Sequence, residues 1–183
     1  MKTGNRTLEL IQERSSIRKY TDEPLTKEEI AILKKTALAT PTGCNFQELR
    51  YAFITCRKII EAMDDRVFSM RSFQRERMRE RGSSSIFYGA PLVIVISSKD
   101  TRWADADAGI AVANLSLAAQ SMGLGSIILG LPENAFLEDD PQNCRTLLKM
   151  EEGERFRLAI GIGHPATTKK PHEQDTSHIR DFA

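Results

Sequence analysis

The sequence predicts one α+β domain, and three observations lead to that fold class. The chain has 183 residues, enough for one well-cored domain and few for two. Helical and strand patterns alternate along it without an internal repeat or an interdomain linker. Hydrophobic residues make up 40% of the chain and charged residues 28%, an ordinary balance for a globular protein. We therefore expect residues 1–183 to form a single domain.

The N-terminal quarter of the chain is expected to be mainly helical. Residues 7–13 form a short opening helix in this prediction. Thr26 and Glu29 have the spacing of a capping box and open a second helix. That helix ends before Pro41, because the residue before a proline disfavours the helical region. Small and polar residues then predict a turn over 40–45.

The middle of the chain alternates strands and helices. A strand is expected over 51–55, and apolar residues at helical spacing predict a helix over 57–81. Residues 92–96 are apolar at every position, which is typical of a central strand covered on both faces. An Ala-rich helix follows over 105–122 and ends at Gly123.

The last third contains two expected strands and one helix. A short strand covers 126–129, and Pro141 opens a helix with Asp140 as its N-cap. Apolar and other residues alternate over 155–162, which predicts a half-buried strand. The final 20 or so residues are too polar to form a core, and we expect them to wrap another surface.

Charge and cysteine content restrict the function classes. The net charge of +1 gives no overall attraction to nucleic acid or membranes. No apolar run approaches the ~20 residues of a membrane span, and the N-terminus lacks the apolar core of a signal peptide. The cysteines, Cys44, Cys56 and Cys144, match no disulfide or metal-ligand spacing, so a cytoplasmic location is expected. A nucleophilic role for Cys44 has no nearby histidine to support it.

Several kinds of site are absent from the sequence. It contains no phosphate-binding P-loop and no dinucleotide fingerprint that opens a helix after a strand. The histidines, His164, His172 and His178, all fall near the C-terminus without a carboxylate cluster, so no metal site is expected.

The segment 14–20 is the first candidate binding element. If its backbone is extended, Arg14, Ser16 and Arg18 point to one side. Two guanidinium groups and a hydroxyl suit a phosphate monoester, which arginine can bind through two oxygens. A solvated surface is the alternative, with nuclear targeting or nucleic-acid binding as less favoured ones.

Three further elements could border a planar ligand. Asn45 and Gln47 carry amides suited to the edge of a heteroaromatic ring. Residues 127–130 offer an apolar wall that ends in a glycine, and Lys169, Lys170 and His172 form a second cationic group. Each element alone is equally compatible with a structural role: turn-capping amides, a core strand and a solvated tail.

The arginine-rich stretch 66–81 is interpreted as a solvated or dimer-facing helix. Interspersed glutamates and the lack of aromatic residues argue against a nucleic-acid surface.

In their order and spacing, these elements resemble the flavin-dependent nitroreductase family. The matching motifs are RSSIRKY (14–20), ATPTGCNFQ (39–47), YGAP (88–91), Asp107 with NLSLAA (114–119), GLGS (123–126) and AIGIGHPA (159–166). The resemblance implies a mostly antiparallel central sheet flanked by helices, in an intertwined homodimer with FMN at the subunit interface.

The resemblance also implies roles for individual residues. Arg14, Ser15, Ser16 and Arg18 would hold the phosphate and ribityl chain. The partner subunit would supply the ring-bordering residues Pro41, Thr42, Gly43, Asn45 and Gln47. Ile128, Leu129 and Gly130 would lie along the ring, with a backbone N–H near Gly130 bonded to the flavin N5. Lys170 and His172 would face the phosphate, and His172 departs from the family's usual Lys/Arg pair.

The implied activity is transfer of reducing equivalents from NADH or NADPH through FMN to a nitroaromatic, quinone or similar acceptor by a ping-pong mechanism. The flavin N5 carries the chemistry, so no side chain is assigned as catalytic. A dehydrogenase or dehalogenase, or a protein that stores or processes flavin without turning over NAD(P)H, remains an alternative. The segment 57–90 is short, so the extra helices that cover the flavin in larger members of the family are expected to be absent or abbreviated.

Overall fold

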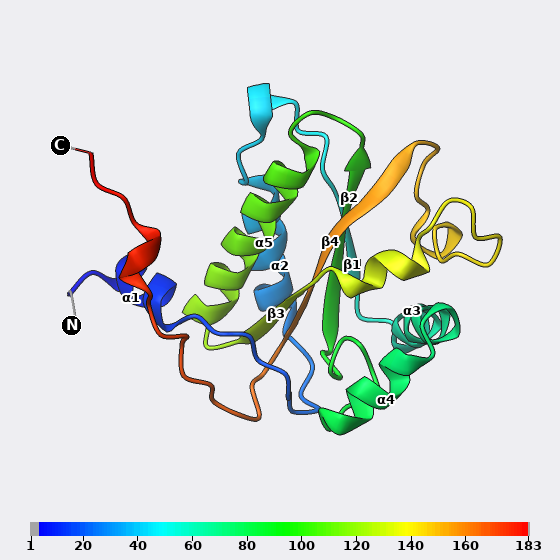
Figure 1. The fold of residues 1–183 in the computed structure, drawn as a ribbon, viewed down its shortest axis with the longest axis horizontal. Coiled ribbons are helices and arrows are strands. Elements are labelled where there is room, and N and C mark those ends of the chain that lie inside the picture. The colour runs from blue at the N-terminus through cyan, green and yellow to red at the C-terminus, as the bar shows by residue number, and fades with distance from the viewer. Residues whose placement is uncertain (1–3, 183) are drawn as a thin grey trace.

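The computed structural model describes residues 4–182 and has an α+β architecture, as predicted. Its sheet has four strands in the order β1-β2-β4-β3, and each neighbouring pair is antiparallel. The strands are β1 (Arg50–Ile54), β2 (Leu92–Lys99), β3 (Gly125–Leu129) and β4 (Glu154–Gly163). The long strands β2 and β4 therefore lie in the middle of the sheet, and the short ones form its edges (Figure 1).

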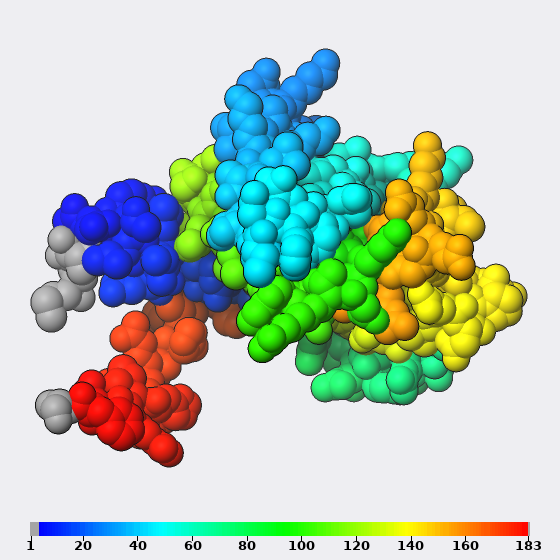
Figure 2. All heavy atoms as spheres, turned by 90° about the horizontal axis from the view of Figure 1, so that it is seen from above, coloured from blue at the N-terminus to red at the C-terminus, as the bar shows by residue number. Residues whose placement is uncertain are grey.

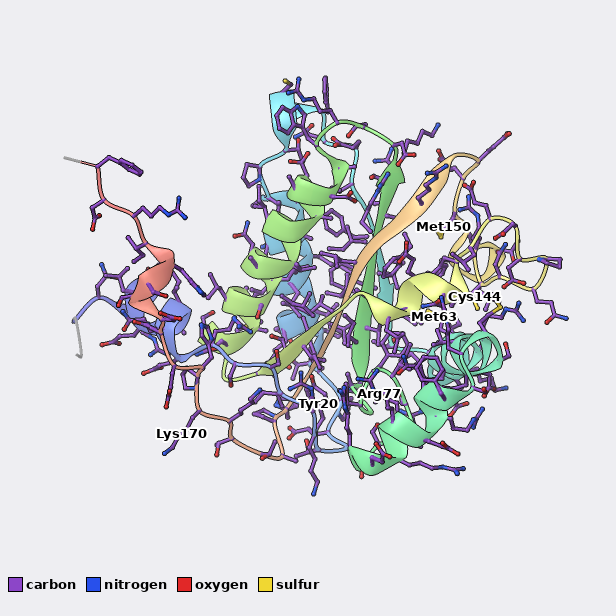
Figure 3. All side chains as sticks on the ribbon, viewed as in Figure 1. Tyr20, Met63, Arg77, Cys144, Met150 and Lys170 are labelled. Carbon is purple, nitrogen blue, oxygen red and sulfur yellow. The ribbon has the colours of Figure 1, made fainter. Side chains whose placement is uncertain are left out.

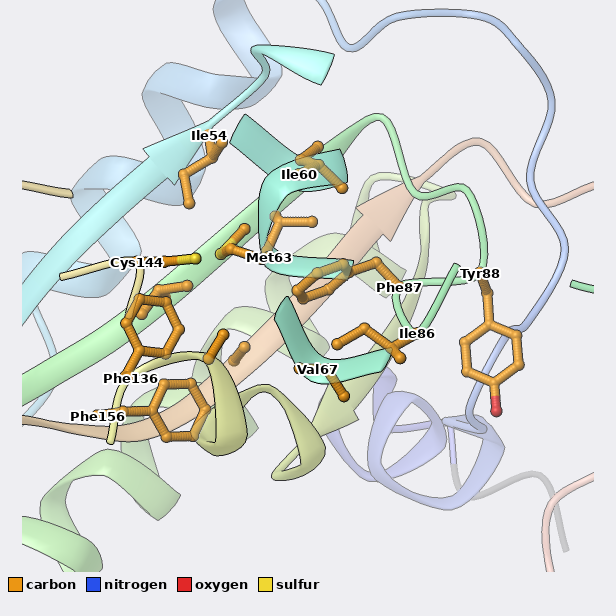
Figure 4. Packing of buried hydrophobic residues seen from close by; sticks show 14 of the residues in the cluster. Ile54, Ile60, Met63, Val67, Ile86, Phe87, Tyr88, Phe136, Cys144 and Phe156 are labelled. Carbon is orange, nitrogen blue, oxygen red and sulfur yellow. The ribbon is translucent and has the colours of Figure 1, made fainter. Parts of the chain in front are cut away.

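Helices cover both faces of the sheet. They are α1 (Arg6–Glu13), α2 (Lys27–Leu38), α3 (Arg57–Met70), α4 (Phe73–Glu80) and α5 (Ala104–Ser121). One core lies between the sheet and helices α2 and α5, while α3, α4 and the segment 86–88 pack on the other face. In the second core, the rings of Phe136 and Phe156 stack with centroids 5.5 Å apart (Figure 4).

Several predicted element boundaries are confirmed within a residue or two. The capping box of α2 is complete, with the Thr26 and Glu29 side chains each accepting a backbone N–H of the other residue. The helix α5 stops just before Gly123, whose φ of 78° few other residues adopt. The strand β2 is covered on both faces: Leu92, Ile94 and Ile96 face α5, and its alternate valines face α3.

The predicted last strand is present as β4, but it is half-buried only over 155–158 and is buried on both faces from Ala159 to Gly163. Ile160 and Ile162 pack under α5, whereas Ala159 belongs to the opposite core. The residues between the isoleucines are small because the neighbouring chain is close. A Cβ on Gly161 would lie 3.0 Å from the Cβ of Ala90.

The helix predicted from Pro141 is wrong. Residues 141–145 form turns, and only a short 3₁₀ segment, Thr146–Leu148, follows. Asp140 is a buried turn residue that accepts the N–H of Gln142 and pairs with the half-buried Arg66. The contact with Arg66 joins positions far apart in sequence, so the local pattern did not reveal it.

The single helix predicted over 57–81 is two helices, α3 and α4, with a break at Arg71. The backbone of Arg71 leaves the helical region at φ −137° and ψ 68°, and its side chain donates to Asn134. The break lets α4 turn across the end of α3.

The C-terminal segment extends away from the sheet. Residues 165–182 are exposed throughout and pass toward α1 at the side of the molecule (Figures 1 and 2). Ile179 and Phe182 within this segment are 67% and 91% exposed, so they are not part of either core. No helix within residues 4–182 has the length and apolar character to cross a membrane.

Candidate cofactor-binding site

The basic segment 14–20 is extended and lies along the edge strand β3. The N–H of Ile17 donates to the carbonyl of Ser126 at 2.9 Å, and Ser16 forms a parallel bridge with Ser126. Ile17 is buried against Gly125, where an added Cβ would lie 2.9 Å from the Ile17 side chain. Ile17 therefore anchors the segment to the sheet, and the polar residues on either side of it are left at the surface.

The C-terminal segment pairs with the other side of this basic segment. The N–H of Thr21 donates to His164, and that of Ala166 donates to Lys19, both at 2.9 Å. Further along, the Ser15 hydroxyl donates to the carbonyl of Lys169 at 2.9 Å. These bonds bring Lys170 next to the basic segment although about 150 residues separate them in sequence.

Tyr20 closes the end of the basic segment. Its hydroxyl donates to the carbonyl of Ile17 at 2.9 Å. Burial raises the pKa of Tyr20 well above its ordinary value, although the charge of Arg18 opposes the shift. The phenol therefore stays protonated and remains a hydrogen-bond donor to the segment.

Alternate residues of the segment face different surroundings. Ser15, Ile17 and Lys169 line a cavity of about 250 Å³ against α5 and β3, together with Glu13. Arg14, Ser16 and Arg18 are not in that lining, consistent with the alternation of an extended chain. Ser15 thus ties the C-terminal segment down and does not belong to the face that carries the two arginines.

The arginines on that face have no acidic partner within residues 4–182. Neither Arg14, Arg18 nor Lys170 has a carboxylate within 4 Å among the residues that the structure describes. Lys170 projects from the outside of the C-terminal segment (Figure 3), and His172 is exposed two residues further on. A group of cations without counter-ions favours an anion more than paired arginines such as Arg157 do.

Tyr88 is a contact of this group that the sequence did not reveal. Its ring lies 5.7 Å from the guanidinium of Arg18, and its hydroxyl accepts from Arg81 at 3.1 Å. Tyr88 lies at the margin of the core beneath α3 (Figure 4). The ring thus orients Arg18.

The end of β3 supplies an apolar surface beside the cations. Ile128, two residues after the bridge to Ser16, is 37% exposed, and Leu129 is half-buried. A Cβ added to Gly130 would meet no atom within 4 Å, so the space above this backbone is open. A flat apolar group could therefore approach the chain here.

The turn that carries the predicted amides has an unusual backbone. It contains a 3₁₀ segment, Gly43–Asn45, and Cys44, Asn45 and Gln47 all have φ between 52° and 56°. The Thr42 hydroxyl accepts the N–H of Gln47 at 2.9 Å and closes the turn. Asn45 and Gln47 are exposed, and Gln47 also lines a groove of about 660 Å³ between α2 and β1.

The structure does not bring this turn to the basic segment. Gly43 is bonded to Asp107 in the first turn of α5, whereas Gln120 at the other end of that helix lines the cavity with Ser15. Asp107 and Gln120 are thirteen residues apart, which corresponds to about 20 Å along the helix. Pro41, Thr42, Gly43, Asn45 and Gln47 therefore lie near the start of α5, and the basic segment lies near its end. Gly130, after β3, lines a groove with Asp105 near the start of α5.

A sequence comparison assigns this chain to a family. The model of the nitroreductase family matches residues 11–164, which include the basic segment, the amide turn and all four strands. The chain belongs to the nitroreductase family.

Solved structures of nitroreductases have the same fold. One with bound FMN, from Desulfitobacterium hafniense DCB-2, superimposes with a TM-score of 0.90 and 29% identity, covering 98% of this chain and 99% of that one. The FMN-dependent nitroreductase of Clostridium difficile R20291 gives a TM-score of 0.84 and 28% identity over 98% of this chain and 100% of that one. Among sequence relatives, the FMN reductase (NAD(P)H) of Bacillus subtilis is 25% identical over 91% of this chain and 70% of its own length.

Proposed function

We propose that this nitroreductase binds FMN and uses it to pass reducing equivalents from NADH or NADPH to a nitroaromatic, quinone or similar planar acceptor. The observation that supports this most directly is the group formed by Arg14, Ser16, Arg18 and Lys170 along β3, a strand whose far end is open at Gly130. Relatives that bind FMN or carry FMN reductase in their names have the same fold or sequence pattern. We infer that these residues act within one domain of a cytoplasmic protein, in which all three thiols are free.

The residues present fit FMN in both charge and shape. The unpaired guanidinium groups suit a phosphate monoester, and the Ser16 hydroxyl adds a further hydrogen-bonding group. Ile128 and Leu129 supply an apolar wall for a planar ring, and the open space at Gly130 leaves its backbone accessible. We expect Lys170, with His172 beyond it, to complete the cationic group around the phosphate.

The remaining half of the site is proposed to come from a second copy of the chain in an intertwined homodimer. Within one chain the amide turn lies about 20 Å away along α5 and points its amides into solvent. A two-fold dimer can place the turn of one copy beside the basic segment of the other. The exposed Ile179 and Phe182 of the C-terminal segment are further apolar surface that a second copy would cover.

Bound FMN would supply the hydride-transfer chemistry, and the residues of this chain would bind and orient it. Arg14 and Arg18 would hold its phosphate, and the end of β3 and the amide turn would orient its ring. We assign no side chain as a proton donor in this chemistry.

An absorbance spectrum of the purified protein tests this proposal. We expect oxidised-flavin bands that bleach on anaerobic addition of NADH or NADPH and return when a quinone is added. Flavin that neither nicotinamide reduces would instead favour a dehydrogenase, a dehalogenase or a flavin-storage protein. A colourless protein that FMN does not reconstitute would contradict the proposal.

Mixed dimers test whether the two halves come from different chains. Arg14→Ala/Arg18→Ala removes the phosphate half, and Asn45→Ala/Gln47→Ala removes the amide half. We expect each homodimer to bind FMN poorly, and a refolded equimolar mixture to recover about a quarter of the wild-type sites, because each mixed dimer contains one intact site. As a control, each variant is refolded alone under the same conditions. No recovery in the mixture would place both halves of the site in one chain.

A further inference from the structure

Asp107 is a buried carboxylate whose two oxygens both bind the backbone N–H of Gly43. It lies in the first turn of α5 and is 3% exposed. Both of its oxygens accept the N–H of Gly43, each at 3.0 Å. No Lys, Arg or His side chain of the described chain lies within 4 Å of it.

A buried carboxylate without a cation is costly, so its position requires a compensating interaction. The first turn of α5 provides part of it, because free N–H groups at a helix start favour negative charge. The charge-assisted bond to Gly43 provides the rest, and such bonds are stronger than neutral ones. Asp107 therefore links the start of α5 to the amide turn more firmly than a neutral polar residue would.

The amide turn needs such a restraint. Cys44, Asn45 and Gln47 are in the left-handed region without being glycine, a conformation that persists only where surrounding contacts impose it. Besides Asp107, the contacts include the Thr42–Gln47 bond, two backbone bonds from Asn45 to Thr42 and from Phe46 to Gly43, and the ring of Trp103 against Gly43. A Cβ on Gly43 would lie 2.4 Å from the Trp103 ring, so the turn has no room to settle deeper onto α5.

We propose that Asp107 is a positioning residue, which holds the Gly43 turn so that Asn45 and Gln47 border the flavin bound to the basic segment of the second copy. This inference rests on the proposed function for its flavin part. The link between Asp107 and the turn can be tested in the cofactor-free protein.

Asp107→Asn is the first variant, because asparagine keeps the shape and one acceptor oxygen but removes the charge. Asp105→Asn is the matched control: Asp105 lies in the same turn of α5, but its side chain is 87% exposed. Trp103 is the only tryptophan of the chain and touches the turn, so its fluorescence reports on the turn directly. We expect Asp107→Asn, and not Asp105→Asn, to change the emission and increase acrylamide quenching of Trp103 without FMN.

The flavin measurements separate positioning from a purely structural role. We expect Asp107→Asn to weaken FMN binding about tenfold, the difference between a charge-assisted and a neutral hydrogen bond. At saturating FMN, we also expect a shifted flavin absorption maximum, because the amides no longer border the ring. A structural role would lower the melting temperature but leave the saturated spectrum unchanged, which would overturn the proposal.

Mixed dimers provide a second, independent readout. Asp107→Ala should behave as a defect of the amide half, so it should recover FMN sites with Arg14→Ala/Arg18→Ala but not with Asn45→Ala/Gln47→Ala. Recovery with the second partner would overturn the proposal. Gly43→Ala serves as a substitute if Asp107→Ala does not fold, because it displaces the turn from the side of Trp103.

The outcomes also distinguish the two proposals. A wild-type protein that binds no FMN would refute the proposed function, while an altered Trp103 signal in Asp107→Asn would still support the link to the turn. Normal FMN affinity, normal spectrum and normal Trp103 quenching in that variant would overturn the role of Asp107 and leave the proposed function standing.

Discussion

Replacing both Arg14 and Arg18 with alanine is expected to weaken FMN binding by about a hundredfold or more, so that the variant is purified without colour. A hydrogen bond to a charged group contributes about 1.5–3 kcal/mol, and two of them correspond to at least two orders of magnitude in Kd. Fluorescence titration of FMN against the cofactor-free protein measures the change.

The fold should survive this double substitution, because neither side chain belongs to a core. Ile17, which anchors the segment, and its bond to Ser126 are untouched. Arg57→Ala/Lys58→Ala is the control, since it removes the same charge from two exposed positions on α3. An FMN affinity equal to that of the control would rule out the basic segment as the phosphate site.

Asp64→Asn is expected to stabilise the protein at pH 7 by up to about 3 kcal/mol and to remove a pH dependence between pH 4 and 6. Asp64 is 6% exposed, and burial raises its pKa from 3.8 to about 6, although bonds from Ser85 and from the N–H of Ile86 oppose the shift. Asparagine keeps the acceptor for Ile86 without the cost of a buried charge.

The sign follows from the two pKa values. Below about pH 4, Asp64 is neutral in both the folded and the unfolded chain and costs nothing. As the pH rises to about 6, the unfolded chain ionises more readily, so the wild type loses stability across that interval. Urea unfolding at several pH values, with the exposed neighbour change Asp65→Asn as control, measures the slope. Equal slopes in wild type and Asp64→Asn would contradict the prediction.

Asp64 is also connected to the candidate cofactor site through Tyr88. Asp64 holds the N–H of Ile86, two residues before Tyr88, and the ring of Tyr88 lies against Arg18. Asp64→Asn, which retains this bond, should therefore leave FMN affinity unchanged. The burial of Asp64 beneath α3 then lowers the stability of the fold without contributing to cofactor binding.

Where the sequence carried a complete local signal, the predicted element was found. Thr26 and Glu29 satisfy each other within one turn of helix, and Gly123 ends α5 through its own backbone freedom. The predictions that were wrong depended on distant contacts. Asp140 has the position of an N-cap after which Pro141 could open a helix, yet its pairing with Arg66 holds it in a turn.

The strand β4 illustrates the same limit. Its alternation of apolar residues with arginine, alanine and glycine is ambiguous, because a small residue can face either solvent or a close neighbour. Only the approach of Ala90 to Gly161 shows that the second face is covered.

The sequence by itself determined the kinds of group available for the site and the family that uses them. The arginines around Ile17, the amides after Pro41 and the glycine after β3 are all readable in order along the chain. The tertiary structure decided how they combine. It pairs Ser15 with Lys169, sets Tyr88 against Arg18, and joins Gly43 to Asp107 across 64 positions. It also leaves the amides at the far end of α5, and such long-range placement depends on packing of the whole chain, which no local pattern encodes.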